Sequence, residues 1–594
     1  MKKYIPSTDW KYFKYLNLKK VFFLSGKRVR KKRDIFFKLT IENQYRLFLM
    51  AIFLTICIFA LIGRLAYIQI FKEKEFYAKA AQQWFKEIPV QPARGKIYDR
   101  NLLRLTNRSN ISYLMIFPEY FETKDEHLEL IKKLTGISIN KLKQDYLLSK
   151  TQPIQLEIKN YDMNCLRKVL SLKGIFPIDS DQRYDPNGIA SHVIGYINKT
   201  DNTGAKGIEK QYDHILKENQ SQKFGAIVDA QKRIIPGLGY ATLHSEDQNQ
   251  KKNIVTTLDY QIQKIVEDTF DQHYTKGSVI VLDAKTGNVL AMMSRPNYDQ
   301  SNVAAFLNHT DKELYNRAIQ IAYPPGSIFK IVIAAAALEN DILDIHDKFT
   351  CTGYETIGNI SIKCSSFKDG GHGTITFEQA FALSCNSAFI QLAQKIGSQK
   401  ILSMAKDFGF GTLTHIGLQE EVYGKLPSME YMKGAGIGNI AIGQGTLEAT
   451  PIQIARMTSI IANDGIDKEI FLVDKIIDDQ KNIIEDIRKK SSSKRVISHR
   501  TAKKIQQLMN KVIAEGTASN IQLDSIGGAA GKTGSAQAVS NRKETVHAWF
   551  TGYFPYENPR YVITIIIENG GSGGSTAAPL FQEICKKIDK LDSQ

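Results

Sequence analysis

The stretch that decides the fold is "PPGSIFKIVIAAAALE", Pro324 to Glu339. After the Pro-Gly pair it predicts a helix that is apolar on nearly every face, as a helix inside a large core is. Ser327 and Lys330 are its only polar side chains before the terminal glutamate, and a spacing of three places them on one face. A serine and a lysine in such a helix need a chemical explanation.

A serine hydroxyl is a weak nucleophile unless a base lies within hydrogen-bond reach. Apolar surroundings disfavour an ammonium group and lower its pKa, so a buried neutral lysine can accept the serine proton. The alternative is an N-cap serine followed by a surface lysine, because Ser-x-x-Lys alone arises often by chance. We interpret Ser327 and Lys330 as a nucleophile and its base, provided that further motifs support them.

Two downstream motifs supply such partners. The tripeptide "SCN", Ser384 to Asn386, adds a hydroxyl and an amide. The segment "GKTGSAQ", Gly531 to Gln537, adds Lys532 and a glycine at which a ligand can approach a strand closely. A second Lys-Thr-Gly, Lys285 to Gly287, precedes the serine and falls between two expected strands, so we interpret it as a turn.

The pattern after residue 253 predicts an α+β domain. Two buried strands joined by a turn are indicated by "GSVIVLDAKTGNVLAMMS", and two more near the end by "HAWFTGYFP" and "RYVITIIIENG". Between them, "FEQAFALSCNSAFIQLAQKIG" indicates a helix, and "APLFQEICKKIDKL" indicates a terminal one. Strands at both ends with helices between them predict one sheet assembled from distant pieces.

The formal net charge of +18 is concentrated at the start of the chain. Residues 1–40 hold thirteen basic and only two acidic side chains, so the excess is a local tail, and we expect no nucleic-acid partner. The next stretch, Leu47 to Gly63, has seventeen residues without a charge. Continued to Phe71, it is long enough for the hydrocarbon layer of about 30 Å.

A basic flank before a single span predicts a cytoplasmic N-terminus with the remainder outside. A cleaved signal peptide is the alternative, but the basic region is too long and no small-x-small site follows it. The predicted divisions are a basic tail over 1–46, a transmembrane helix over 47–71, a mixed α+β region over 72–252 and the catalytic domain over 253–594.

Ser-x-x-Lys, Ser-x-Asn and Lys-Thr-Gly in this order resemble the active-site set of the penicillin-binding proteins and serine β-lactamases. Several further stretches resemble class B high-molecular-weight penicillin-binding proteins, namely "ARGKIYDRN", "RYDPNGIASHVIGY", "GAKGIEKQYD" and "NIAIGQGTLEATPIQIA". The stretch "HAWFTGYFP" is most similar to the elongation-type branch, the penicillin-binding proteins 2. The resemblance implies a central antiparallel sheet flanked by helices, carried on a dimerisation-type pedestal.

The resemblance also implies roles in acyl transfer. Ser327 would attack the carbonyl of the penultimate D-alanine of a peptidoglycan stem peptide, and Lys330 would receive its proton. Ser384 would relay a proton to the leaving D-alanine with help from Lys532, while Asn386 would position the substrate amide and Lys330.

The substrate carboxylate would be held by the second lysine motif. The resemblance places Thr533, Gly534 and Ser535 against this group. The oxyanion would be held by the backbone N–H groups of Ser327 and Ser535. No cofactor is implied for the chemistry, and β-lactams would acylate the same serine.

The family further implies a setting at the bacterial cytoplasmic membrane, with the catalytic domain periplasmic or otherwise outside the cell. We find no second catalytic domain between the span and residue 253. Glycan polymerisation would therefore come from a partner, a SEDS-type polymerase, within the rod-shape complex.

A cluster of potential metal ligands accompanies the second motif. The residues Cys351, Cys364, His372 and Cys385 could form a structural zinc site, which resembles a site in some elongation-type relatives. The alternative is a Cys351–Cys364 disulfide with a buried Cys385.

Four other functions share parts of this pattern. A β-lactamase of class A would need Glu-x-x-x-Asn between Asn386 and Lys532, and this spacing is absent. A β-lactam-sensing receptor would need several spans and a His-Glu-x-x-His motif. A D,D-carboxypeptidase using water as the acceptor, and a division-type transpeptidase, remain open alternatives.

Overall fold

The structure is a computed structural model with two compact units, residues 1–85 with 228–233 and residues 86–227 with 234–594. It describes residues 41–73, 76, 85–87 and 94–593, apart from 119–120, 150–152, 187, 199–200, 218–221, 228–239, 245–251, 308, 359, 491 and 541–542. The predicted basic tail therefore lies largely outside the described residues.

The first unit contains one long apolar helix. Helix α1 (Ile41–Ala66) continues into a π-helical turn, η1 (Tyr67–Phe71). The segment Tyr45–Phe71 is long and apolar enough to cross a membrane. This agrees with the predicted span.

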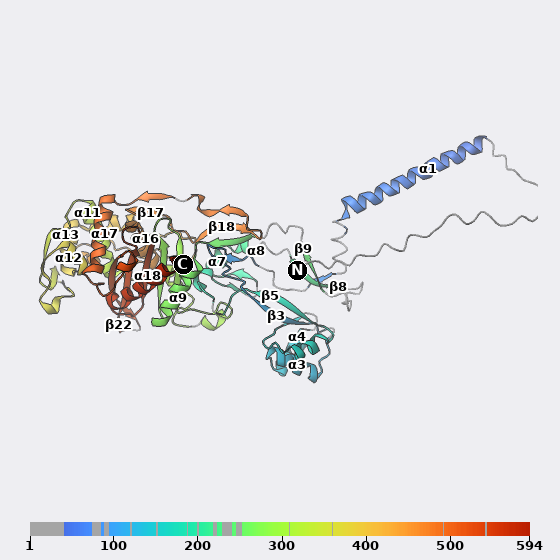
Figure 1. Ribbon diagram of the computed structural model, residues 1–594, viewed down its shortest axis with the longest axis horizontal. Coiled ribbons are helices and arrows are strands. Elements are labelled where there is room, and N and C mark those ends of the chain that lie inside the picture. Colours follow the sequence, from blue (N-terminus) through green and yellow to red (C-terminus); the bar gives the residue numbers. More distant parts are fainter. Residues whose placement is uncertain are drawn as a thin grey trace, which may run out of the picture. The chain divides into compact units, whose positions relative to one another are not determined.

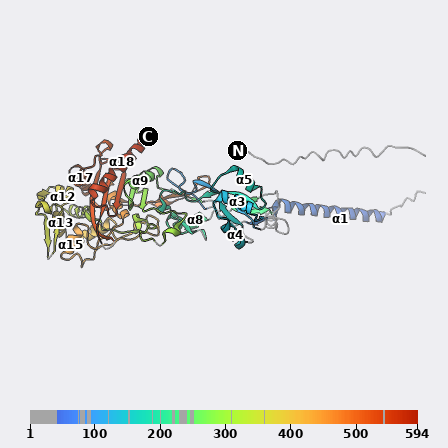
Figure 2. The same cartoon turned by 90° about the horizontal axis from the view of Figure 1, so that it is seen from below.

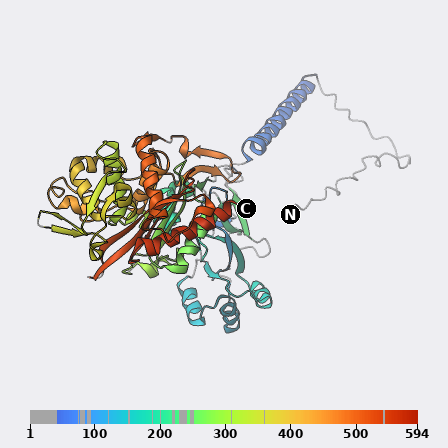
Figure 3. The ribbon, with the colours of Figure 1, turned by 60° about the vertical axis from the view of Figure 1, so that its left-hand side comes forward.

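The pedestal region of the second unit has its own small core. Strand β3 pairs with β4 and β5, and the helices α3, α4 and α5 pack on this sheet through apolar residues such as Leu114, Ile131 and Val169. In Figure 3 these helices are the cyan group. The elements are β1 (Phe85–Glu87), β2 (Ile97–Tyr98), β3 (Ser109–Ile116), α3 (Asp125–Thr135), α4 (Ile139–Leu148), β4 (Ile154–Glu157), α5 (Met163–Leu170), β5 (Ile175–Gln182), α6 (Ser191–Ile194), β6 (Ile197–Asn198), β7 (Thr203–Gly204), α7 (Gly207–Gln211), α8 (Asp213–Lys217), β8 (Gln222–Ile227) and β9 (Tyr240–His244).

A buried ion network joins three stretches that resemble the pedestal family. Glu209 in α7 is fully buried and contacts two arginines, with distances of 3.0 Å to Arg94 and 2.6 Å to Arg183. The hydroxyl of Tyr184 donates to the same carboxylate at 2.9 Å. One carboxylate thus holds together segments that are far apart in the chain.

The catalytic region is built on a five-stranded antiparallel sheet in the order β12-β11-β23-β22-β21. This confirms the predicted sheet of distant pieces, since β11 and β12 precede the serine and the other three strands lie near the end of the chain. The strands are β11 (Gly277–Asp283), β12 (Val289–Arg295), β21 (Ala530–Ser540), β22 (Lys543–Phe554) and β23 (Tyr561–Ile567).

Helices cover both faces of this sheet. Helices α9 (Tyr260–His273) and α18 (Ala578–Asp592) contact each other, and the rings of Phe550 on β22 and Phe581 on α18 lie 4.5 Å apart (Figure 1). Helix α16 (Pro451–Ala462) packs on the sheet through Thr458, whose hydroxyl lies 2.6 Å from that of Thr551. The sheet is therefore buried on both faces.

A second sheet links the two predicted regions. Strand β10 (Lys252–Thr256) pairs in parallel with β2 of the pedestal and antiparallel with β18 (Val473–Asp478), which pairs with β19 (Ile483–Asp486). The predicted boundary at residue 253 falls inside β10, and it remains a prediction.

One predicted helix is broken in the structure. The stretch "FEQAFALSCNSAFIQLAQKIG" forms α12 (Phe377–Ala382) and α13 (Asn386–Ile396), because Ser384 between them adopts a left-handed backbone with φ of 55°. Figure 2 shows these helices at the same end of the molecule as α17 (His499–Ala514). The remaining elements are η3 (Val303–Phe306), α10 (Arg317–Gln320), β13 (Lys348–Cys351), β14 (Tyr354–Ile357), β15 (Ile360–Lys363), η5 (Phe367–Asp369), β16 (Gly373–Thr376), α14 (Ser398–Asp407), α15 (Gly436–Ala441), β17 (Ile466–Lys468), η6 (Ile487–Lys490), β20 (Ser493–Arg495), η7 (Asp524–Ile526) and η8 (Gly573–Ala577).

The buried network predicts a large stability effect at Glu209. Replacement by alanine leaves the Arg183 guanidinium without a carboxylate and leaves Arg94 with Asp213 alone, at 2.8 Å. Breaking a buried ion pair in this way typically costs about 3–5 kcal/mol. We expect Glu209→Ala to lower the thermal unfolding midpoint of the full-length chain markedly. Glu129→Ala, which removes an exposed pair with Lys132, is the control and should change stability by less than about 1 kcal/mol. Equal effects of the two substitutions would contradict the proposed importance of the network.

Candidate active site

The serine lies in a turn that precedes the buried helix. Residues Gly326–Phe329 form a 3-10 turn, η4, and α11 (Lys330–Glu339) follows directly. Because a 3-10 turn has three residues per turn, side chains at i and i+3 eclipse each other. Ser327 and Lys330 therefore share one side, as the sequence predicts, although the serine precedes the α-helix instead of lying in its first turn.

Lys330 is fully buried and points at the second motif. Its Nζ donates to Ser384 O at 2.6 Å, to Ser384 Oγ at 3.2 Å and to Asn386 Oδ1 at 2.8 Å. Burial lowers the pKa of Lys330 to about 8, against an opposing effect of Cys385 and Cys364. A neutral amine is thus available near neutral pH.

Lys532 reaches the same hydroxyl from strand β21. Its Nζ lies 3.0 Å from Ser384 Oγ and 3.2 Å from Thr533 O. Burial, and then the charge of Lys330, hold the pKa of Lys532 well below its usual value. The Ser384 hydroxyl therefore lies between two buried amines from segments far apart in the sequence.

Strand β21 lies directly against the serine turn. A Cβ at Gly534 would come within 3.1 Å of both Pro325 O and Ile328 Cγ1, so a side chain there would force its neighbours to shift and glycine favours this approach. The indole of Trp549 on β22 donates to Pro324 O at 3.2 Å. The Ser327 hydroxyl is half-buried and has no hydrogen bond to another described residue.

The loop after α15 supports the serine turn from another side. The N–H of Gly326 donates to Gly443 O at 2.9 Å. Gly443 has a φ of 71°, and a Cβ there would lie 1.9 Å from Gly326 O. The stretch "NIAIGQGTLEATPIQIA" thus contributes a close backbone contact to the nucleophile turn.

The predicted carboxylate-binding residues have defined partners. The Thr533 hydroxyl lies 2.5 Å from that of Thr517, and Ser535 Oγ accepts from Gly573 N at 3.2 Å. Thr517 belongs to no motif that the sequence singles out. The structure singles it out through its contact with Thr533, which joins the loop after α17 to strand β21.

The loop of the second motif is fixed on both sides of Ser384. The amide of Asn386 donates to Lys363 O at 3.0 Å while its Oδ1 accepts from Lys330. Cys385 occupies the N-cap position of α13. A left-handed non-glycine residue at this point is a strained conformation that its surroundings must hold.

The four predicted metal ligands converge beside this loop. The ligand atoms of Cys351, Cys364, His372 and Cys385 all lie within 4.8 Å of one another. The Cys364 and Cys385 sulfurs are 3.8 Å apart, and Cys364 Sγ lies 3.6 Å from His372 Nδ1. Zn–S bonds of about 2.3 Å in a tetrahedron place two sulfurs about 3.8 Å apart, so this spacing fits zinc.

The alternative disulfide is not formed in the structure. Cys351 and Cys364 are both free, like the other cysteines of the described chain. The Cys364 hydrogen bond and then burial raise the pKa of the Cys385 thiol. Sequence reasoning missed Ser366, whose hydroxyl lies 3.0 Å from His372 Nδ1.

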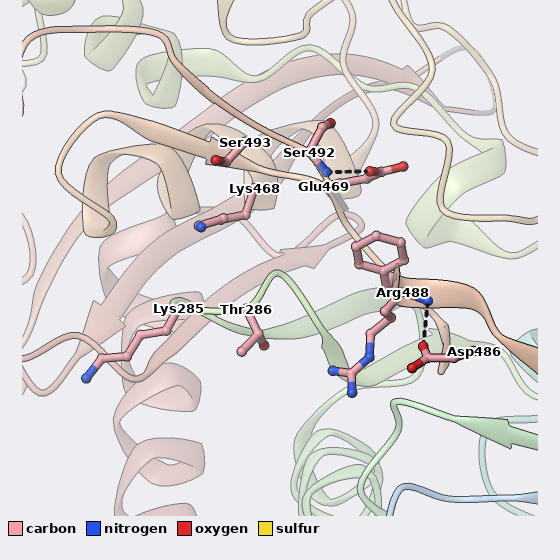
Figure 4. Close-up of a pocket in the computed structure, with 9 residues that line it drawn as sticks. Lys285, Thr286, Lys468, Glu469, Asp486, Arg488, Ser492 and Ser493 are labelled. Carbon is pink, nitrogen blue, oxygen red and sulfur yellow. Dashed lines mark hydrogen bonds between the residues drawn. The ribbon is translucent and has the colours of Figure 1, made fainter. Parts of the chain in front are cut away.

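The first Lys-Thr-Gly lies elsewhere, as predicted. Asp283 Oδ1 accepts from the backbone N–H of Lys285 and of Thr286 in the turn between β11 and β12. Figure 4 shows both residues on the wall of a separate cavity of about 350 Å³, near Lys468 and Arg488. This tripeptide therefore takes no part in the site around Ser384.

Comparisons with known proteins agree with this geometry. Residues 277–586 match the family described as "Penicillin binding protein transpeptidase domain", and residues 89–256 match "Penicillin-binding Protein dimerisation domain".

Similar proteins cover most of the chain. Stage V sporulation protein D of Bacillus subtilis is 30% identical over 91% of this chain and 85% of its own. The peptidoglycan D,D-transpeptidase MrdA of Acinetobacter baumannii is 28% identical over 90% and 86%. The solved structure of penicillin-binding protein 2 from Helicobacter pylori is 25% identical with a TM-score of 0.67, covering 85% of this chain and 99% of that one. The chain therefore belongs to the penicillin-binding protein transpeptidase family.

Proposed function

We propose that the chain is a peptidoglycan D,D-transpeptidase that cross-links stem peptides through an acyl-enzyme on Ser327. The observation that carries this proposal is the Ser384 hydroxyl, which two buried amines contact at 3.2 and 3.0 Å beside the serine turn. Curated relatives named peptidoglycan D,D-transpeptidase support the same reaction class.

The first half-reaction forms an ester. Ser327 Oγ attacks the carbonyl carbon of the penultimate D-alanine, and neutral Lys330 takes its proton. The C–N bond to the terminal D-alanine then breaks, and a proton passes through Ser384 and Lys532 to the leaving amine. The N–H groups of Ser327 and Ser535 hold the oxyanion, where losing one donor costs about 3 kcal/mol.

The second half-reaction regenerates the serine. The amine of a neighbouring stem attacks the ester, forms the cross-link and returns a proton to Ser327. Thr533, Gly534 and Ser535 hold the donor carboxylate in the first step, and Asn386 positions Lys330. Water in place of the amine would give the D,D-carboxypeptidase reaction, which product analysis of cross-link against free tetrapeptide distinguishes.

The cellular role that fits best is elongation and cell-shape maintenance. A solved structure shows penicillin-binding protein 2 of Helicobacter pylori in complex with MreC, and that protein is 25% identical to this chain. This supports a partner from the rod-shape complex. We also propose a SEDS-type glycan polymerase as partner and a single span at Tyr45–Phe71 with the N-terminus cytoplasmic. A shared membrane raises the effective concentration of such partners.

Zinc is the metal that the cysteine cluster fits. Three thiolates and one imidazole make a closed tetrahedral set with no open position, so the ion would be structural. It would be held by Cys351, Cys364, His372 and Cys385, and its effect would be to fix the loop that carries Ser384 and Asn386.

The reaction predicts a covalent adduct that depends on Ser327. Full-length protein incubated with a labelled penicillin should gain one adduct in intact mass, and Ser327→Ala should gain none, because the ester oxygen is missing. Ser593→Ala, at an exposed serine near the end of α18, is the control and should react like the unaltered chain.

The same assay has a predicted pH dependence. Only the neutral amine of Lys330 can accept the serine proton, so the acylation rate should rise as the pH increases through about 8. A rate that does not change between pH 7 and pH 9 would contradict the role of Lys330 as the base, and an adduct that persists in Ser327→Ala would contradict the assignment of Ser327 as the nucleophile.

The proposed role predicts a change of cell shape on depletion. A rod-shaped host depleted of this protein should form rounded cells in light microscopy, because side-wall cross-linking stops while division continues. Filamentous cells would instead assign the chain to division.

The cluster predicts bound zinc. Full-length protein purified without chelators should contain about one equivalent of zinc, and Cys351→Ser should lose most of it, because a ligand is removed. Cys165→Ser, at a buried cysteine of the pedestal, should keep the metal. Less than about half an equivalent, together with a Cys351–Cys364 disulfide in the mass spectrum, would refute zinc.

A further inference from the structure

A second cavity lies next to the segment that leads into the serine turn. Its volume is about 450 Å³, within the range of small-molecule and carbohydrate sites. Its wall includes Lys312, Tyr315, Gln320, Tyr423 and Glu448. None of these residues belongs to the three catalytic motifs.

Two backbone segments connect this cavity with the nucleophile. Tyr323 exchanges backbone hydrogen bonds of 2.9 and 2.8 Å with Ala449, directly after Ala322 and Glu448 on the cavity wall. Further along, Gly326 N donates to Gly443 O. Ala322 is five residues before Ser327, so this part of the wall lies at most about 17 Å from the Cα of Ser327.

The wall is held rigidly from behind. Arg317 is buried and donates to Lys312 O at 3.3 Å and to Asp311 O at 2.7 Å. Its Nε lies 2.7 Å from Glu568 Oε1, which also accepts from the Tyr323 hydroxyl at 2.7 Å. One buried ion pair thus fixes both the loop on the cavity wall and the segment before the serine.

The groups that face the cavity are suited to a polar ligand without net charge. The Glu448 carboxylate, the Tyr423 hydroxyl and the Gln320 Nε2 have no hydrogen-bond partner in the part of the chain that the structure describes. Lys312 contributes one positive charge and Glu448 one negative charge. The cavity wall therefore offers both hydrogen-bond donors and acceptors, and its one positive and one negative charge favour neither an anionic nor a cationic ligand.

Two tyrosines add exposed aromatic surface. Tyr423 is 59% exposed and Tyr315 is 43% exposed. The Nζ atoms of Lys206 and Lys312 lie 5.6 and 5.7 Å from the centre of the Tyr315 ring. The Tyr315 ring is therefore already in contact with two ammonium groups, whereas the exposed Tyr423 ring, beside mixed donors and acceptors, matches the C–H faces and hydroxyl edges of sugars.

We propose that this cavity binds the glycan strand that carries the donor stem peptide. This inference rests on the proposed transpeptidase function. A stem peptide whose fourth residue is esterified to Ser327 extends over about four residues, or roughly 14 Å, before it reaches its sugar. That length is compatible with the upper bound of about 17 Å between Ala322 on the cavity wall and Ser327.

The test compares donors with and without sugar. For full-length protein, acyl-enzyme formation is followed by intact mass with a β-lactam, with a bare stem pentapeptide and with the same pentapeptide on its disaccharide. In the variant Tyr423→Ala/Glu448→Gln, the concentration of disaccharide-pentapeptide for half-maximal acylation should rise roughly tenfold. The values for the bare pentapeptide and the β-lactam should stay unchanged.

A second measurement detects binding of the glycan without any acylation of Ser327. Glycan chains stripped of their stem peptides should show saturation-transfer NMR signals with the unaltered protein and with Tyr161→Ala, a pedestal tyrosine with 58% exposure. The signals should disappear in the double variant.

Three outcomes would overturn the subsite. One is an unchanged response to the disaccharide donor, and another is an equal loss for the bare peptide, which would assign the cavity to peptide. The third is an equal loss for the β-lactam, which would make the effect structural. Failure of the proposed function is distinguishable, because the unaltered protein would then form no adduct with any of the three compounds.

Discussion

Two buried lysines that contact the same hydroxyl define the centre of this protein. Lys330 and Lys532 are fully buried and reach the same hydroxyl, that of Ser384. Burial lowers the pKa of both lysines, and the charge of Lys330 lowers the pKa of Lys532 further. The arrangement requires a closed core around it, which the helix α11, the edge strand β21 and the Ser384 loop supply together. The lowered pKa values of both lysines therefore depend on this closed core, because exposure of either amine to water would raise its pKa toward the usual value.

The remaining architecture serves to bring these three segments to one point. The sheet places β21 at its edge, where Gly534 allows the strand to touch the serine turn. The loop at Gly443 and the indole of Trp549 fix that turn from two further sides. Behind them, the pair of Arg317 and Glu568 fixes the preceding segment. A nucleophile that has no hydrogen bond of its own within the described chain is thus positioned by its backbone.

Local patterns in the sequence predicted several helices and strands of the catalytic region. They did not predict which segments meet, and only the order of the three motifs indicated that Ser327, Ser384 and Lys532 belong to one site. The hairpin β11–β12 and the strands β22 and β23 follow from apolar runs with turn residues between them. The break at Ser384 could not be predicted, because the apolar spacing on both sides of it continues as in one helix. Its left-handed backbone lies where Lys330 Nζ donates to Ser384 O, a contact between residues 54 positions apart. The Arg317–Glu568 pair was missed because its two residues are 251 positions apart. Thr517 and Ser366 belong to no recognisable motif, and only their hydrogen bonds to Thr533 and His372 single them out.

The strained loop also explains why a cysteine cluster lies where it does. A non-glycine residue with φ near 55° costs of order 1–3 kcal/mol, and it persists only where the surroundings over-determine it. Ser384 cannot be replaced by glycine without losing the hydroxyl that both lysines contact. The conformation must therefore be held from outside, and Cys385, the next residue, converges with Cys351, Cys364 and His372. A closed tetrahedral ion at this position would hold one side of the loop while Lys363 O holds Asn386 on the other. The left-handed backbone of Ser384 and the four candidate metal ligands therefore lie side by side, and Cys385 is both the residue after Ser384 and a member of the cluster.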